Sequence, residues 1–184
     1  MGHLKIAVLV GSLRKGSFNR QLAHALEKLA GGELEFEFVR IDDLPLYNQD
    51  HEQEYPPAAK KMKEQIAAAD AVLFVTPEYN RSIPGVLKNA IDIASRPYGT
   101  SAFAGKPGAV IGTSKSSVGT ALAQQHLRNI CAYLDVKLLA QPEAFVQFRD
   151  DLLDEDGTIR IESSRKFLQD FVDRYIAWVK RFKD

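Results

Sequence analysis

Residues 11–19, Gly-Ser-Leu-Arg-Lys-Gly-Ser-Phe-Asn, form a polar loop between an apolar run and the start of a helical pattern. Backbone N–H groups at the start of a helix have no intrahelical partner, and the helix dipole favours negative charge there. Ser12, Ser17 and Asn19 add side-chain donors. The loop therefore predicts an anion site with phosphate as its ligand, and a Gly/Ser turn without a ligand is the alternative.

This loop lacks the residues of several known phosphate-binding motifs. Its two glycines have the spacing of a nucleoside-triphosphate loop, but Ser17 stands where that motif requires Lys. Leu13 stands where a dinucleotide-binding fingerprint has its second Gly. A phosphatase loop needs a Cys nucleophile, and the only cysteine of the chain is Cys131. What remains is a site for one terminal phosphate, bound by neutral donors with Arg14 nearby.

A second loop, 76–85, follows a wholly apolar run and precedes another helical pattern. Pro77 and Pro84 stiffen its two ends, Tyr79 offers a flat apolar face, and Asn80 and the backbone offer hydrogen bonds. A planar heteroaromatic ring needs this combination of apolar faces and polar edges. A third loop, 112–119, is rich in Gly and Ser, and we expect it to close over the far edge of the same ring.

These loops connect strands and helices that alternate along the chain. Periodicity predicts strands at 6–10, 33–39, 71–75, 108–111 and 136–139. It predicts helices at about 20–30, 57–69, 84–94, 120–134 and 164–182. Such alternation implies right-handed crossovers and a parallel sheet, in which ligands bind at the carboxyl ends of the strands. The three loops should therefore converge at one edge of the sheet.

Three other segments carry predictions about the surroundings of this sheet. Apolar residues alternate with glutamates over 33–39, which places that strand at or near an edge. The loop 41–50 holds Leu44, Leu46 and Tyr47, and it either packs on its own core or contacts a second subunit. An acidic Asp-Glu-Asp-Gly stretch at 154–157 lies between apolar pairs and predicts a tight turn in a hairpin-like excursion.

Composition excludes several classes of protein. A chain of 184 residues with 45% apolar residues fits one domain over 1–184. Lys plus Arg equal Asp plus Glu at 24 each, so no net charge recruits nucleic acid or an acidic membrane. No apolar run approaches the roughly 20 residues that span a bilayer, and a single cysteine forms no internal disulfide. His126 and Cys131 face different sides of one predicted helix and predict no metal site. We expect a soluble, cytoplasmic protein.

The first two loops also carry long sequence signatures. The second reads Pro-Glu-Tyr-Asn-Arg-Ser-Ile-Pro-Gly at 77–85, and Leu-Lys-Asn-Ala-Ile-Asp follows at 87–92. With the 11–19 loop, in this order and spacing, it resembles the two signatures of the NAD(P)H-dependent FMN reductase family, which includes soluble quinone, chromate and ferric reductases. The resemblance covers nearly the whole chain. It implies a flavodoxin-like three-layer α/β sandwich, with a five-stranded parallel sheet in the order 2-1-3-4-5 and helices on both faces.

The same resemblance implies one noncovalent FMN per subunit, in a homodimer or a tetramer. The phosphate would contact residues of the first loop, namely Ser12, Arg14, Ser17, Phe18 and Asn19. The isoalloxazine ring and ribityl chain would contact the second loop, through Pro77, Glu78, Tyr79, Asn80 and Ser82. The third loop departs from the commoner family form, with Lys-Ser-Ser-Val-Gly-Thr at 115–120, and its contacts are assigned to Ser114, Ser116 and Ser117.

The reaction implied by the resemblance is a ping-pong transfer of hydride from NADH or NADPH to FMN and then to a small oxidant. Quinones, chromate and ferric complexes are the expected acceptors. The flavin is the reactive group, and no side chain of the protein is required to react. The alternative is a flavin-binding redox sensor or electron carrier without significant turnover.

Three charged residues are candidates for positioning the nicotinamide nucleotide. Arg81 and Arg96 either meet its phosphates or are solvated surface charges. The Glu78 carboxylate either orders Arg81, Arg96 or a neighbouring subunit, or is a surface acid.

Overall fold

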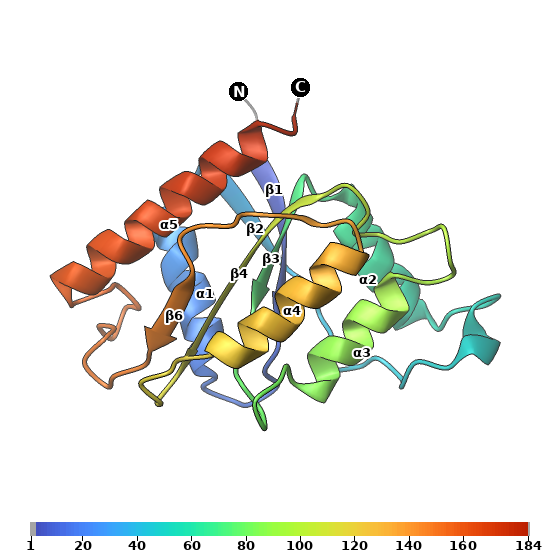
Figure 1. Ribbon diagram of the computed structural model, residues 1–184, viewed down its shortest axis with the longest axis horizontal. Helices are drawn as coiled ribbons and strands as arrows, with labels where there is room; N and C mark the ends of the chain where they lie inside the picture. The colour runs from blue at the N-terminus through green and yellow to red at the C-terminus, as the bar shows by residue number, and fades with distance from the viewer. Residues whose placement is uncertain (1–2, 184) are drawn as a thin grey trace.

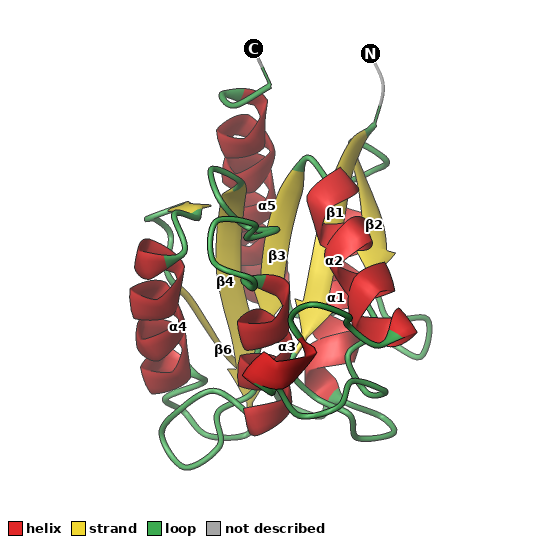
Figure 2. Ribbon diagram, turned by 90° about the vertical axis from the view of Figure 1, so that its right-hand side faces the viewer, coloured by secondary structure: helices red, strands yellow, loops and turns green. Residues whose placement is uncertain are grey.

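The structure, a computed structural model, describes residues 3–183 as a central sheet between two layers of helices (Figures 1 and 2). The strands are β1 Leu4–Val10, β2 Leu34–Phe38, β3 Ala71–Val75, β4 Pro107–Ser114, β5 Lys137–Leu138 and β6 Ala144–Gln147. The helices are α1 Phe18–Leu29, α2 Pro57–Ala68, α3 Gly85–Ala94, α4 Ala121–Tyr133 and α5 Glu162–Lys180, with a 3₁₀ turn, η1, at Gln49–His51. None of the helices in residues 3–183 is both long and apolar enough to cross a membrane.

The sheet has the strand order β2-β1-β3-β4-β5, and all of its pairings are parallel. This confirms the predicted order and the edge position of β2. Successive side chains of a strand point to opposite faces, and the core divides accordingly. On β1, Ile6 and Val8 face the cluster with α1 and α5, whereas Ala7 and Leu9 face the cluster with α2, α3 and α4.

The opposite edge differs from the five-stranded prediction, because two short strands lie beside β4. β5 pairs with 107–108, and β6 pairs with 111–114. The intervening segment contains Pro142, which has no backbone N–H to donate to a ladder. β6 buries Ala144 and Val146 but exposes Phe145, so its apolar residues do not alternate with polar ones, and the sequence predicted β5 alone.

Element boundaries also differ slightly from the predictions. α1 begins at Phe18 rather than Arg20, because Ser17 caps it, and it ends before Gly31, whose φ of 57° a glycine adopts readily. β4 continues to Ser114, so residues 112–114 of the predicted third loop belong to the strand. The hairpin-like excursion is confirmed by an antiparallel bridge between Leu153 and Ile159.

The loop 41–50 packs mainly on its own core. Leu44 and Tyr47 pack against the cluster under α2 and α3, whereas Leu46 remains 82% exposed. Asn89 of α3 holds the loop: its Oδ1 accepts from the Tyr47 N–H at 2.7 Å, and its Nδ2 donates to the Pro45 carbonyl at 2.8 Å.

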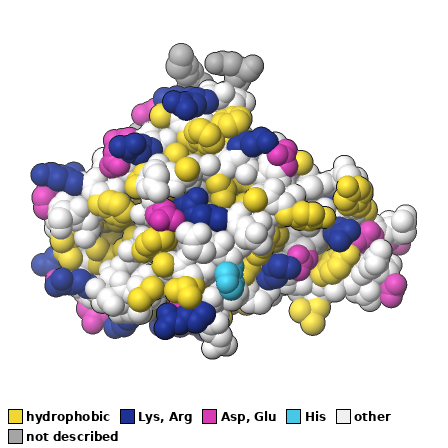
Figure 3. All heavy atoms as spheres, in the orientation of Figure 1, with side chains coloured by type: hydrophobic (Ala, Val, Ile, Leu, Met, Phe, Trp, Pro, Cys, Tyr) yellow, Lys and Arg dark blue, Asp and Glu magenta, His cyan; other side chains and the backbone are white. Residues whose placement is uncertain are grey.

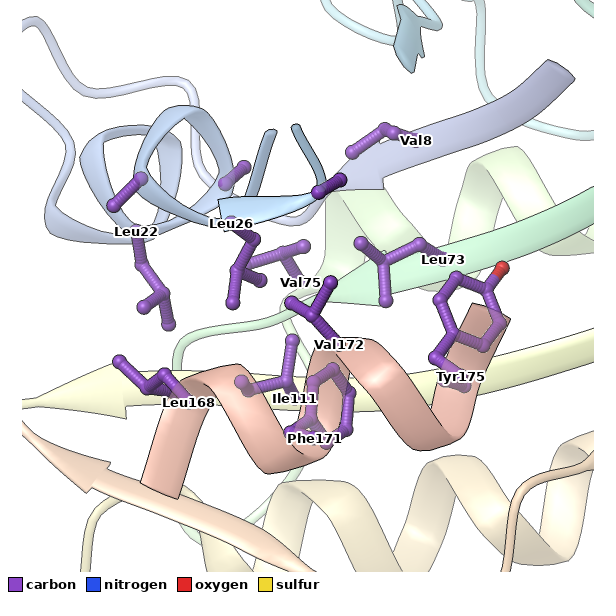
Figure 4. Close-up of a cluster of buried hydrophobic side chains, with 14 of the residues drawn as sticks. Val8, Leu22, Leu26, Leu73, Val75, Ile111, Leu168, Phe171, Val172 and Tyr175 are labelled. Atoms are coloured by element: carbon purple, nitrogen blue, oxygen red, sulfur yellow. The ribbon is translucent and has the colours of Figure 1, made fainter. Parts of the chain in front are cut away.

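Helix α5 covers one face of the sheet with the apolar stripe predicted from its sequence. Leu168, Phe171, Val172 and Tyr175 point toward β3, β4 and α1 (Figure 4). The buried Tyr175 hydroxyl donates to the Val72 carbonyl at 2.9 Å, which satisfies its one polar atom. Helix α5 therefore packs against β3 and β4, the strands whose carboxyl ends carry the second and third loops.

We predict that Phe171→Ala lowers the free energy of unfolding by about 3 to 5 kcal/mol, because it leaves a cavity in this core. Phe171 is 1% exposed, whereas Phe167 on the same helix is 39% exposed. The matched control Phe167→Ala should cost less than about 1 kcal/mol. Urea unfolding followed by circular dichroism measures both, and equal losses would contradict this assignment of the buried face.

Candidate functional site

The ends of β1, β3 and β4 lie side by side, so the loops that follow them converge as predicted. The Gly11 N–H donates to the Val75 carbonyl at 2.9 Å, and the Thr76 N–H donates to the Ile111 carbonyl at 3.0 Å. Gly112 lies so close to β3 that a Cβ on it would stand 2.0 Å from the Thr76 carbonyl oxygen. Only glycine fits there, and its absence of a side chain lets the second and third loops approach each other.

The first loop presents buried hydroxyls at the N-terminus of the 12-residue helix α1. The Ser17 side chain is the N-cap: its Oγ accepts from the Arg20 N–H at 3.3 Å, which leaves its own O–H free to donate. Ser12 and Ser17 are 6% and 2% exposed. The N–H groups of Phe18 and Asn19, in the first turn, have no intrahelical acceptor. These donors suit one phosphate group.

Asn19 is used differently from the prediction, which gave its side chain to the ligand. Its Nδ2 donates to the Thr113 carbonyl at 2.9 Å, and its Oδ1 accepts from the Thr113 N–H at 3.0 Å. Both hydrogen bonds are buried. Together they join the start of α1 to the end of β4.

Phe18 likewise packs within the protein and supports the charges of the loop. Its ring stacks on Phe148 with centroids 4.0 Å apart. The Arg14 guanidinium lies 4.4 Å above the ring and donates to the Gly16 carbonyl at 2.9 Å. Lys115 of the third loop lies 5.5 Å from the same ring. The Phe18 ring thus lies beside two cations, and its backbone N–H is one of the unpaired donors at the start of α1.

Residues 79–82 of the second loop form a tight hairpin turn. Tyr79 and Ser82 exchange backbone hydrogen bonds at 2.9 and 3.0 Å, and the two residues between them, Asn80 and Arg81, have φ of 51° and 65°. Two successive left-handed residues define a type I′ turn, which Asn tolerates and Arg adopts at a cost of about 1 to 2 kcal/mol. Tyr79 is 51% exposed and forms a flat rim on the loop.

The Glu78 carboxylate connects this turn to α4. Its Oε2 accepts from the N–H groups of Leu122 and Ala123 at 3.0 and 3.2 Å, and its Oε1 lies 3.4 Å from Arg81 Nη1. The Thr120 side chain does not cap α4, because its hydroxyl accepts from Gln124 Nε2 instead. Glu78 is therefore the acid that satisfies the N-terminus of α4, and its side chain is only 10% exposed.

Arg96 is not brought to the three loops. It follows the C-terminus of α3 and lines a pocket of about 290 Å³ with Tyr98, Tyr133 and Asp135. Asp135 lies two residues before β5, so this pocket lies at the amino ends of the strands. The three loops lie at the carboxyl ends, on the opposite side of the sheet. Glu78 pairs with Arg81, as one interpretation expected, and makes no contact with Arg96 among the described residues.

The third loop is folded mainly by its own serines. The Ser114 hydroxyl donates to the Gly119 carbonyl at 2.6 Å and accepts from the Ser116 N–H at 3.2 Å. The Ser116 hydroxyl accepts from the Val118 N–H at 3.3 Å. Ser117 is exposed on the tip. The side chains of Ser114 and Ser116 thus shape the loop.

One contact at the site was missed by the sequence analysis. The Ser82 Oγ lies 2.9 Å from His126 Nδ1 on α4. These residues are 44 apart in the chain, and no spacing signal connects them. Cys131, on the same helix, is buried, and burial raises the pKa of its thiol to about 12. No group of three or more His, Cys, Asp or Glu in residues 3–183 is arranged to hold a metal ion.

Known proteins are similar to this chain in sequence and fold. A model of the NADPH-dependent FMN reductase family matches residues 4–151. A 2-hydroxy-1,4-benzoquinone reductase from a Burkholderia species is 58% identical over 177 residues, which cover 96% of this chain and 97% of that protein. The solved structure of FerB, a flavoenzyme NAD(P)H:(acceptor) oxidoreductase from Paracoccus denitrificans, superposes with a TM-score of 0.95 at 46% identity, covering 97% of this chain and 98% of that one.

A more distant structure extends the likeness of fold. A flavodoxin variant from Pseudomonas aeruginosa superposes with a TM-score of 0.58 at 20% identity and covers 96% of this chain and 99% of its own. At this identity the likeness concerns the fold alone, and with the strand order it confirms the flavodoxin-like architecture predicted from the sequence.

We predict that Glu78→Ala frays the first turn of α4, because its N–H groups lose their acceptor. The loss of a helix cap costs about 0.5 to 2 kcal/mol, and Glu78→Gln should lose less because its amide oxygen still accepts. Amide hydrogen exchange at Leu122 and Ala123 measures the fraying. Glu143→Ala is the matched control, because Glu143 contacts α4 only through Gln125 and Arg128. Unchanged exchange in Glu78→Ala would contradict the capping role.

Proposed function

The chain belongs to the NADPH-dependent FMN reductase family, and on this premise we propose that it transfers reducing equivalents from NAD(P)H, through FMN, to quinones. The observation that carries the proposal is the convergence of a phosphate-type helix N-terminus and a rigid aromatic turn at the carboxyl ends of adjacent strands. This is where an open α/β sheet binds its ligand. The quinone acceptor is supported by the 58% identity to the Burkholderia reductase.

The residues present fit FMN. We assign its phosphate to the hydroxyls of Ser12 and Ser17, the N–H groups that begin α1, and Arg14. Neither hydroxyl donates to an acceptor within residues 3–183, so a phosphate oxygen would give each of them a partner. FMN, when bound, supplies the hydride chemistry of the reaction, and the chain supplies position and shielding.

The second and third loops are assigned to the ring end of the cofactor. Pro77 and Tyr79 offer apolar contact area, and the left-handed turn at Asn80 and Arg81 offers backbone hydrogen-bonding groups. Glu78 acts indirectly, because its carboxylate is committed to α4 and Arg81. The serines of the third loop, Ser114, Ser116 and Ser117, would contribute through the backbone that they shape and through the exposed tip.

Access for the two substrates is assigned to the rim of the site. Arg81 is 68% exposed beside Tyr79, where it is free to meet the phosphates of a pyridine nucleotide. Arg96 would take part only if a second subunit brought it there. We propose a homodimer or tetramer, supported by the exposure of Tyr98 and Tyr133 on one pocket at 84% and 79%. A cytoplasmic location is proposed with it. Chromate and ferric complexes are proposed as further acceptors.

We predict that Ser17→Asp weakens FMN binding at least about tenfold but leaves α1 capped, because Asp is an equally good N-cap and its charge opposes the phosphate. Riboflavin, which has no phosphate, should lose less than about threefold in affinity. Quenching of flavin fluorescence on titration into the apoprotein measures both. Ser163→Asp, which adds the same charge at the start of α5, is the control. An unchanged FMN affinity in Ser17→Asp would place the phosphate elsewhere.

We predict that the purified protein binds FMN and that NADH or NADPH bleaches its visible flavin absorbance without oxygen. Addition of 1,4-benzoquinone should then restore the oxidised spectrum, with one quinone consumed per nucleotide. Anaerobic absorbance spectroscopy measures both half-reactions. A flavin that stays oxidised in the presence of both nucleotides would favour a sensor or electron carrier instead.

A further inference from the structure

Quinone reduction needs a proton as well as a hydride. A quinone that accepts a hydride becomes a hydroquinone anion, and one proton on its oxygen completes the hydroquinone. A side chain that supplies this proton near neutral pH is most often histidine. A role for such a donor rests on the proposed function, because it presumes that hydride reaches a quinone at this site.

Among the described residues, His126 is the histidine that contacts the loop cluster. Its Nδ1 lies 2.9 Å from the Ser82 hydroxyl oxygen, and Ser82 closes the hairpin turn of the second loop. His24 contacts Glu27 on α1, and His51 belongs to η1, so both lie on other elements. Glu78 is committed to the N-terminus of α4, which removes the nearest carboxyl as a donor.

A groove of about 560 Å³ opens beside this pair, between α3 and α4. Its lining residues are Ser82, Ile83, Gly85, Lys88, His126, Asn129 and Ile130. The isoleucines offer apolar walls for a flat ring, and the polar members offer donors for carbonyl oxygens. Lys88 is neutralised by Asp92 of α3 at 2.8 Å, and charges of both signs are interspersed on the face drawn in Figure 3. A small neutral quinone fits this lining better than an anion does.

We infer that Ser82 and His126 form a proton relay for a quinone bound in this groove. As the quinone gains the hydride and its electron pair, the Ser82 hydroxyl gives its proton to the hydroquinone oxygen. The Ser82 oxygen takes the Nδ1 proton of the His126 imidazolium in the same step. The neutral imidazole then regains one proton from water. Overall, one quinone, one NAD(P)H and one proton become one hydroquinone and one NAD(P)⁺.

The relay is tested by comparing acceptors that do and do not need a proton. Holoenzyme reduced by one equivalent of NADPH is mixed in a stopped-flow instrument with 1,4-benzoquinone or with ferricyanide, which takes electrons only. His126→Gln keeps a hydrogen-bonding side chain near Ser82, but its amide does not release a proton near neutral pH. Loss of a general acid typically slows a step by about 10² to 10⁴-fold. We expect the quinone rate constant to fall at least tenfold more than the ferricyanide rate constant, in His126→Gln and in Ser82→Ala.

His24→Gln is the matched control, because it removes an imidazole from a different helix. It should leave the ratio of the two rate constants unchanged. Equal losses for quinone and ferricyanide in His126→Gln, or no loss for either, would overturn the relay. Failure of NADPH to reduce the wild-type holoenzyme would instead overturn the proposed function, so the two failures are distinguishable.

A second measurement does not depend on turnover. Hydroquinone is titrated into the oxidised holoenzyme, and the imidazole ¹⁵N resonances are followed by NMR. The His126 resonances should shift on saturation while those of His24 stay in place, and Ser82→Ala should reduce the shift. A His126 signal that is unmoved by bound hydroquinone would overturn the placement of the quinone in this groove.

Discussion

The paired hydrogen bonds between the Asn19 side chain and the Thr113 backbone set the geometry on which the candidate site depends. They tie the N-terminus of α1, which follows β1, to the end of β4 at 2.9 and 3.0 Å, and β3 lies between these two strands. A buried amide with both partners satisfied is costly to break, because either half would be left without a hydrogen bond. The first loop and the third loop are therefore held at a fixed separation whether or not a ligand is bound.

The second loop is held in that frame by hydrogen bonds rather than by its ion pair. Arg81 is 68% exposed and 3.4 Å from Glu78, and a pair this open to solvent contributes about 0 to 1 kcal/mol. The left-handed conformation of Arg81 costs about 1 to 2 kcal/mol. The two backbone bonds between Tyr79 and Ser82, at about 0.5 to 1.5 kcal/mol each, are of the size to offset it. Glu78 adds the link to α4, so turn and helix support each other.

The sequence predicted the features that repeat locally and missed those that join distant segments. The stripe of α5, the alternation in β2 and the convergence of the loops follow from periodicity and from the geometry of parallel sheets. The contacts of Asn19 with Thr113 and of Ser82 with His126 span 94 and 44 residues. Residue type assigned Asn19 to the ligand, and the family resemblance assigned Ser82 to it. An amide or a hydroxyl in a loop gives no local sign of an internal partner.

Similar reasoning explains the strand that was missed. β6 buries Ala144 and Val146 but exposes Phe145, so its apolar residues do not alternate with polar ones, and its pairing depends on β4. The stripe of α5 was visible because nineteen residues repeat one spacing. An element was therefore predicted where its apolar residues match the face that it buries.

The two edges of the sheet restrict how copies of this protein can associate. β2 has five residues with Glu35 and Glu37 on alternate positions, and Lys5 pairs with Glu37 at 2.7 Å. The other edge is interrupted between β5 and β6. Short, charged or broken edges are poor templates for a strand from another chain. Continuation of the sheet across a subunit boundary is thereby disfavoured, and any stable assembly must be built from helical and loop surfaces.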